Sequence, residues 1–260
     1  MLFSETTTAV MDGIAADLES RLAGAPTVES AAQAMAGLIY ETFVESAVLV
    51  RVFIAVPFGR LPGADQYFVR RLVGAREAAL LKPHTPVLSL LATRGRQDRW
   101  NDRYGSRGHL GIPLASEEFV ESIPMIARLL KELGARLEWA ADLDTAIVTA
   151  ALGPVAGAFY VEDAAAGVDQ HGRKIISAQD FVAEYGVRTV FGFGGAYPVG
   201  RAFLATVVFT REAVERQQAD RFMRLTNTFR GATLRAAREN RLFEADVAPS
   251  RGRAGGGPSD

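Results

Sequence analysis

Apolar residues follow helical spacing through the first part of the chain and then give way to an almost continuous apolar run. Over 6–22 they recur every three or four residues, which predicts an amphipathic helix. The spacing resumes after Thr27, which can cap a second helix that ends near residue 45. The run 48–56 contains one polar residue, Arg51, and therefore predicts a central strand covered on both faces.

The segments that follow predict a helix and then a strand. Helical spacing over 65–81 places Tyr67, Leu72 and Ala75 on the buried side of a helix. The apolar run 85–93 predicts a second strand.

A charged segment separates this strand from the next helical pattern. Residues 94–111 have no regular period, and their glycines argue against a helix or a strand. Helical spacing returns over 116–133. Pro124 is compatible with this helix if Ser122 caps it, because proline is tolerated in a first turn.

The second half of the chain predicts strands separated by one loop and one short helix. The strands are expected over 144–152, 157–162, 187–194 and 201–210, with a loop over 163–177 and a helix over 178–185. We expect the first two strands to pair with each other. The last two form a hairpin across the turn at 195–200.

Helical spacing in 211–243 predicts a long final helix that carries many arginines. Arginines on one helix can form a nucleic-acid footprint, but acidic residues are interleaved here. We therefore expect a solvated face and an apolar helix–helix seam, and no nucleic-acid partner. The seam suggests a homodimer through the terminal helices. Residues 244–260 are rich in Pro, Gly and Ser and are expected to be disordered.

Together these elements predict an α+β fold in which helices flank a central antiparallel sheet. A single domain is expected over 1–243, with N-terminal helices at 6–45, a core at 46–210 and a C-terminal helix at 211–243. The helices at both ends of the chain are expected to be long.

Composition narrows the function classes. The chain has no cysteine, which excludes disulfides, thiolate nucleophiles, cysteine-ligated zinc and thioether-linked tetrapyrroles. A net charge of −1 gives no overall attraction to nucleic acid or to anionic membranes. The N-terminus does not resemble a secretory signal, and no apolar run is long enough to cross a bilayer. We expect a soluble, cytoplasmic protein with no membrane partner.

Several short motifs resemble GAF-like sensory regions of bacterial signalling proteins. The matching segments are 111–120 (GIPLASEEFV), 123–126 (IPMI), 178–182 (AQDFV), Tyr185-Gly186 and 191–195 (FGFGG). The resemblance extends over about 27–237 and implies a GAF-like fold. Such regions typically precede histidine kinase or protein phosphatase output domains. No output domain follows the last helix here, so we expect signalling by association, with a separate kinase or phosphatase as a candidate partner.

The densest polar cluster lies in the irregular segment and predicts a loop that closes over a small molecule. Here Arg103 would meet an anionic group and Trp100 would stack on the ligand, with Ser106 and His109 beside them. The alternative is a surface loop with Trp100 in the core and its charges paired together. His109 can also bind haem, as in some GAF-type sensors, or can cap a turn.

Aromatic residues on or beside the predicted sheet are the other candidates for the ligand site: Tyr160, Tyr185, Phe191 and Phe193. Strand alternation places Phe191 and Phe193 on one sheet face, and core packing is the alternative role for all four. The three histidines show no metal-ligand spacing. His171 lies near Asp163 and Asp169 in a flexible segment and gives a weak acid–base hypothesis.

The sequence thus predicts a non-enzymatic GAF-like sensory protein. It would bind an unknown small ligand between the sheet and the loops at 94–113 and 163–177. Ligand binding would change how the terminal helices pack in a dimer. The alternative is an interaction module whose pocket is filled by its own side chains. An empty cavity would favour the first hypothesis over the second.

Overall fold

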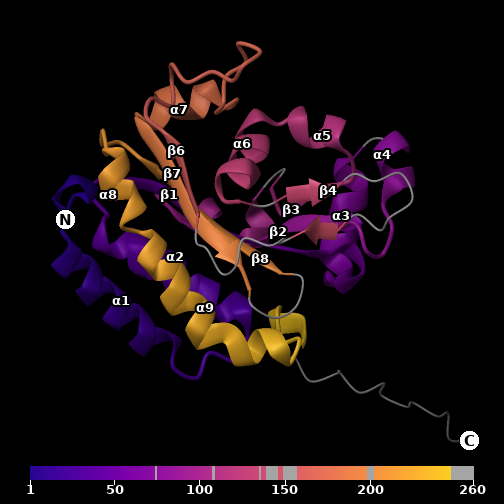
Figure 1. Cartoon of the computed structure of the whole chain (residues 1–260), viewed down its shortest axis with the longest axis horizontal. Helices are drawn as coiled ribbons and strands as arrows, with labels where there is room; N and C mark the ends of the chain where they lie inside the picture. Colours follow the sequence, from indigo (N-terminus) through magenta and orange to yellow (C-terminus); the bar gives the residue numbers. More distant parts are fainter. Residues whose placement is uncertain are drawn as a thin grey trace, which may run out of the picture.

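An antiparallel sheet of six strands, in the order β3-β2-β1-β8-β7-β6, forms the middle layer of the computed structural model (Figure 1). Its strands are β1 (Ala47–Pro57), β2 (Pro86–Gly95), β3 (Gly111–Pro113), β6 (Gly157–Val161), β7 (Thr189–Ala196) and β8 (Phe203–Thr210). A separate pair joins β4 (Arg136–Glu138) to β5 (Ala146–Val148). The structure describes residues 1–73, 75–106, 109–134, 136–138, 146–148, 157–197 and 202–246.

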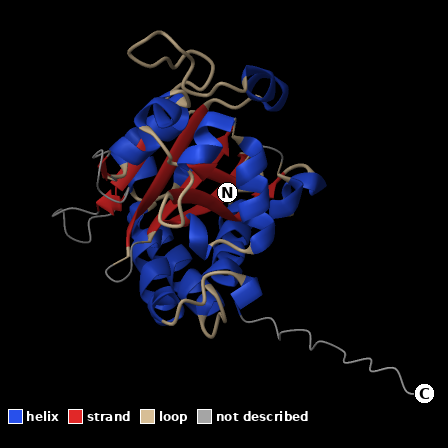
Figure 2. Cartoon of the chain, turned by 90° about the vertical axis from the view of Figure 1, so that its right-hand side faces the viewer, coloured by secondary structure: helices blue, strands red, loops and turns tan. Residues whose placement is uncertain are grey.

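Helices lie on both faces of the sheet, as Figures 1 and 2 show. They are α1 (Thr8–Leu22), α2 (Val28–Thr42), α3 (Gly63–Leu72), α4 (Ala75–Leu80), α5 (Glu117–Glu121), α6 (Pro124–Glu132), α7 (Gln179–Tyr185), α8 (Arg216–Asp220) and α9 (Met223–Arg238). One face is covered by α1, α2 and α9, which pack against one another. The other face is covered by α5, α6 and α7.

The strands bury alternate side chains on these two faces. In β7, Phe191 and Phe193 pack under the α1–α2–α9 layer, whereas Val190 faces the α5–α6–α7 layer. This alternation is as predicted. The glycines of β7 also have a steric reason, since a Cβ at Gly194 would lie only 2.1 Å from the Leu204 carbonyl oxygen of β8. The glycines of β7 therefore allow β7 and β8 to pair closely, and they do not form a phosphate-binding loop.

The central position of β1 is confirmed by its pairing with β2 on one side and β8 on the other. The two N-terminal helices are also confirmed. The Thr27 hydroxyl accepts a hydrogen bond from the Ser30 amide at 3.0 Å, while the Ser30 hydroxyl accepts one from the Thr27 amide at 3.2 Å. This reciprocal cap starts α2 where the sequence predicts it.

The predicted helix at 65–81 is two helices, α3 and α4, and its expected buried face is wrong. Tyr67 and Leu72 are 62% and 39% exposed, while Asp65 and Val69 are buried. A pattern of apolar residues could not predict this buried face, because the buried Asp65 forms an ion pair with Arg103, which is far from it in the sequence. The Ala75 side chain lies outside the described part of the structure.

The helix at 116–133 is also divided, because α5 ends at Glu121 and α6 begins at Pro124. Ser116 caps α5, and Ile123 stands at the N-cap of α6 in place of Ser122. Pro124 does occupy the first position of its helix, as expected.

The expected pairing of 144–152 with 157–162 is wrong. Within the described residues, β5 pairs with β4, and β6 pairs with β7. The β7–β8 hairpin is confirmed, although most of its turn lies outside the described residues. The short strand β3 adds an edge to the sheet beside β2 that the sequence analysis did not predict.

The final helix at 211–243 is shorter than predicted and is divided into α8 and α9. Residues 211–215 instead bond to the sheet end: the Arg211 amide donates to the Ser46 carbonyl and the Val214 amide to the Thr189 hydroxyl. These bonds delay the helix until Arg216. At the other end α9 stops at Arg238, and Asn240 has a positive φ of 57°. Of the predicted tail at 244–260, the structure describes only a short 3₁₀ turn at Glu244–Asp246.

The apolar seam of the terminal helices lies within the chain. Phe222, Leu225 and Phe229 are buried in the same cluster as residues of α1, α2 and the sheet. These residues therefore need no second copy to cover them, and the homodimer stays a prediction. No helix in the described ranges is long and apolar enough to span a bilayer.

Candidate ligand pocket

A cavity of about 710 Å³ lies on the face of the sheet that carries α5, α6 and α7. Its floor comes from β1, β3 and β8, through Leu49, Arg51, Phe53, Ile112 and Phe209. Its walls come from the 3₁₀ turns at 98–106 and from His109, from α5 and α6, and from α7 and the three residues before it. Volumes of about 300–1,000 Å³ are usual for small-molecule sites.

Aromatic side chains form one end of the pocket. The Trp100 ring meets the Tyr185 ring edge to face with centroids 4.8 Å apart, and it meets Phe181 at 5.6 Å. Phe181 in turn meets Phe209 of β8 at 5.5 Å. Trp100 can lie close over the end of β2 because position 95 is glycine, where a Cβ would be 2.8 Å from its ring. The result is a rigid aromatic wall.

Arg51 brings a positive charge into this mainly apolar cavity. Its Nη2 donates a hydrogen bond to the Ser106 hydroxyl at 3.2 Å, and Ser106 is itself buried. Its Nε is shielded from solvent and has no hydrogen-bond partner among the described residues. Burial lowers the pKa of Arg51 to about 10, so the guanidinium is still charged at neutral pH.

Other ionisable side chains stand at the exposed rim. Arg99 and Glu184 are exposed residues that line the pocket, and so is His109. A hydrogen bond with Glu184, together with burial, raises the pKa of Tyr185. Among the described residues that line the pocket, two arginines, Arg51 and Arg99, stand against one glutamate, Glu184.

Four of the predicted site residues line this pocket: Trp100, Ser106, His109 and Tyr185. The predicted loop at 94–113 contributes to it as expected. Most of the loop at 163–177 does not, since only its last residues, Ile176 and Ser177, reach the cavity. His109 brings an imidazole to the mouth of the site, and a haem ligand role for it stays a prediction.

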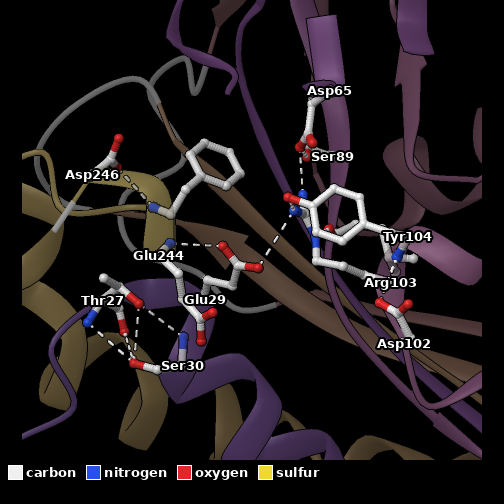
Figure 3. Close-up of polar contacts among 12 residues, drawn as sticks. Thr27, Glu29, Ser30, Asp65, Ser89, Asp102, Arg103, Tyr104, Glu244 and Asp246 are labelled. Carbon is white, nitrogen blue, oxygen red and sulfur yellow. Dashed lines mark hydrogen bonds and ion pairs between the residues drawn. The ribbon is translucent and has the colours of Figure 1, made fainter. Parts of the chain in front are cut away.

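Arg103 lies elsewhere, in a buried cluster of charges (Figure 3). Its Nη2 donates to the Asp65 carboxylate at 2.5 Å, and its Nη1 is 3.5 Å from the Glu29 carboxylate. Burial raises the pKa of both carboxyls, against the opposing effect of Arg103. Arg103 thus ties the loop to α2 and α3 and is already neutralised. It cannot meet an anionic ligand in the pocket as predicted.

The three remaining candidates also lie outside the pocket. Tyr160 donates its hydroxyl to the Val214 carbonyl at 2.7 Å and so anchors the segment before α8. Phe191 and Phe193 pack against Phe222 on the opposite sheet face, at 5.2 and 6.0 Å between ring centroids. The alternation of side chains along β7 places both phenylalanines on one face of the sheet, and the pocket lies on the opposite face.

His171 forms no acid–base pair with the carboxylates near it in sequence. Asp169 instead accepts hydrogen bonds from the backbone amides of His171 and Arg173 and pairs with the Arg173 side chain. Asp163 accepts two backbone amides of its own loop. In the described part of the chain, no cluster of three or more His, Asp or Glu side chains could hold a metal ion.

Sequence analysis missed the pocket residues of α5 and α6, together with Arg51. The helical residues, Phe119, Ile123, Met125 and Ile126, carry only a core-like apolar pattern. Arg51 did give a signal, because it is the one polar residue of an otherwise apolar central strand. A charge at such a position requires a partner or a ligand.

No protein-family model and no curated protein matches this chain. Solved structures of similar fold include free methionine-R-sulfoxide reductase of Neisseria meningitidis in complex with its substrate. Its TM-score is 0.49 at 12% identity, over 92% of this chain and 98% of that chain. Two GAF domains from a cyanobacterial phytochrome, one with phycoerythrobilin and one with phycocyanobilin, have TM-scores of 0.47 and 0.48. They are 12% and 11% identical and cover 88% of this chain and 97% and 96% of their own.

The reductase corrects one expectation. The prediction of a non-enzymatic protein is contradicted by this neighbour, which is an enzyme. At these identities the likeness concerns architecture alone. The six-stranded antiparallel sheet with helices on both faces confirms the α+β fold expected from the sequence.

Proposed function

We propose that this chain is a GAF-like domain that binds a small organic molecule in the pocket over β1 and β8. The observation that carries the proposal is an open cavity of about 710 Å³ with an aromatic wall and a half-buried arginine, Arg51, in its floor. Apolar surroundings with few polar groups are typical of ligand sites. A sheet face needed only for packing would be filled by side chains.

The cavity also separates this proposal from the alternative of an interaction module with a vestigial pocket. That alternative requires that the protein's own side chains fill the space. Under α1, α2 and α9 the aromatic side chains of Phe3, Phe43, Phe191 and Phe222 pack against one another in this way. The space over β1 and β8 toward α5 and α6 is not filled, which favours a bound ligand.

A sensory role would use β1 and β8 to connect the pocket with the helical layer behind the sheet. In β1, Arg51 and Phe53 face the pocket, while Val50 and Val52 pack toward the terminal helices. A ligand that prefers one arrangement of these strands would shift the packing of α2 and α9. In the proposed role this shift is read by a partner in the cytoplasm, through a second copy of the chain or a separate kinase or phosphatase.

A thermal-shift screen with metabolites and cyclic nucleotides tests the binding proposal. A ligand that binds only the folded state raises the melting temperature as its concentration exceeds Kd. The matched control is Met125→Trp, which places a larger side chain in the cavity from α6. We expect at least one compound to stabilise the wild-type protein and not the variant. Compounds that stabilise both proteins equally, or none that stabilises either, would contradict the proposal.

A further inference from the structure

Arg51 is the feature of the pocket that packing does not explain. It stands in the central strand of the sheet, between Leu49 and Phe53 on the same face. Its direct neighbours across the sheet are Thr93 of β2 and Val207 of β8. Neither carries a charge. The Thr93 hydroxyl is also buried without a hydrogen-bond partner among the described residues.

Among the described residues, no carboxylate forms an ion pair with Arg51, and the one hydrogen bond that its side chain donates goes to the neutral Ser106 hydroxyl. Arginine has five N–H donors, so most of them are unused here. A buried cation without a counter-charge costs free energy. Such a cost is retained at functional sites, where a ligand supplies the missing charge.

Arg103 shows how the same protein treats a buried arginine with a structural role. Its guanidinium lies between the carboxylates of Asp65 and Glu29 and donates to the Leu90 carbonyl at 2.7 Å (Figure 3). Arg51 has no such set of acceptors among the described residues, and its side chain donates only to the Ser106 hydroxyl. The difference is that Arg51 opens on the cavity.

We infer that the pocket binds an organic anion whose oxyanion group pairs with the Arg51 guanidinium and whose apolar body lies against Trp100 and Phe181. This inference rests on the proposed function and names the ligand class of the same site. Carboxylate, sulfonate and phosphate groups share the geometry that a guanidinium recognises with two parallel hydrogen bonds. The rim adds a second cation, Arg99, against one carboxylate, Glu184.

Two fluorescent probes that differ by one charged group test the inference. 8-Anilinonaphthalene-1-sulfonate has an aromatic body and a sulfonate, and N-phenyl-1-naphthylamine has the same body without the charge. Both are titrated into the full chain and into the variants Arg51→Met, Arg51→Lys and Arg238→Met. Arg238 is exposed on α9, so its removal controls for the loss of one positive charge outside the pocket.

We expect Arg51→Met to weaken binding of the sulfonate probe about tenfold or more, the usual effect of losing one hydrogen-bonded charge pair. Binding of the neutral probe should change little. Arg51→Lys should keep part of the affinity, because it keeps the charge and loses the paired geometry. Arg238→Met should leave both probes unaffected. Arg51→Met should also melt no lower than the wild-type protein without ligand, since it removes an unpaired buried charge.

The outcomes separate the two proposals. If both probes bind the wild-type protein, bind Met125→Trp more weakly and bind Arg51→Met with unchanged affinity, the ligand site is supported and the anion inference is wrong. If neither probe binds, or if Met125→Trp leaves both bound with unchanged affinity, the proposed ligand site itself is wrong. If Arg51→Met does not fold, equal affinity of Arg51→Lys and the wild-type protein for both probes overturns the inference.

Discussion

At the scale of single residues, Arg103 and Arg51 have opposite environments. Arg103 is surrounded by carboxylates and fixes the loop at 98–106 to α2 and α3. Arg51 faces a cavity with one hydroxyl as its partner. The sequence analysis assigned the anion-binding role to Arg103, because only its position in a polar loop was visible. Its partners, Asp65 and Glu29, are 38 and more than 70 positions away in the chain, so no local pattern could reveal them.

The Arg103 cluster predicts a pH dependence of stability. Burial raises the pKa of Asp65 and of Glu29, and this effect exceeds the lowering of both pKa values by Arg103. Because both carboxyls have higher pKa values in the folded protein than in the unfolded chain, the folded state binds more protons. The stability that their protonated forms contribute is therefore lost as the pH rises through the raised pKa values. We therefore expect Asp65→Asn to cost less stability at about pH 8 than at about pH 5. Urea unfolding at both pH values measures this, and a cost that grows with pH would contradict it.

Gly95 predicts a steric effect that a surface glycine lacks. A Cβ there would lie 2.8 Å from the Trp100 ring, 2.9 Å from Leu49 Cδ1 and 3.0 Å from the Val48 carbonyl oxygen. We expect Gly95→Ala to lower the free energy of unfolding by about 1–3 kcal/mol and to weaken probe binding. In Gly13→Ala the new methyl group meets nothing within 4 Å, and the variant should gain about 0.5–1 kcal/mol from helix propensity. Two variants of equal stability would show that the wall at Trp100 is not tightly packed.

At the scale of elements, the structure agrees with the sequence where short-range rules decide. The cap at Thr27, the alternation in β7 and the αL glycine that ends α7 at Gly186 depend on neighbours only a few residues apart. The failures depend on distant contacts. The segment 211–215 is extended because it bonds to Ser46 and Thr189, and β5 pairs with β4 in place of β6.

The caps of the two N-terminal helices give a graded prediction. Thr27 is fully buried and shares reciprocal bonds with Ser30, whereas Thr7 is exposed and accepts one longer bond, at 3.3 Å, from the Val10 amide. We expect Thr27→Ala to lower the free energy of unfolding by about 1–2 kcal/mol and Thr7→Ala by about 0.5 kcal/mol. Denaturant unfolding of the two variants checks the order, and the reverse order would refute the assignment.

At the scale of the whole molecule, the two faces of the sheet differ in how they are packed, and a second, polar cavity lies between α2, the end of β2 and residues 101–104. The α1–α2–α9 face is closed by aromatic packing around Phe3, Phe43 and Phe222, while the other face retains the pocket. The layer order could be predicted from the apolar periods of the helices and strands. The sequence could not predict which face would stay open, because that depends on how far α5, α6 and the turn at Trp100 lie from the sheet.

A crystal structure of the protein with 8-anilinonaphthalene-1-sulfonate tests most directly whether this open face receives an anionic ligand at Arg51. We predict a sulfonate oxygen within hydrogen-bond distance of the Arg51 guanidinium, with the probe rings against Trp100 and Phe181. A probe bound at another surface, or a pocket closed by the protein's own side chains, would contradict it.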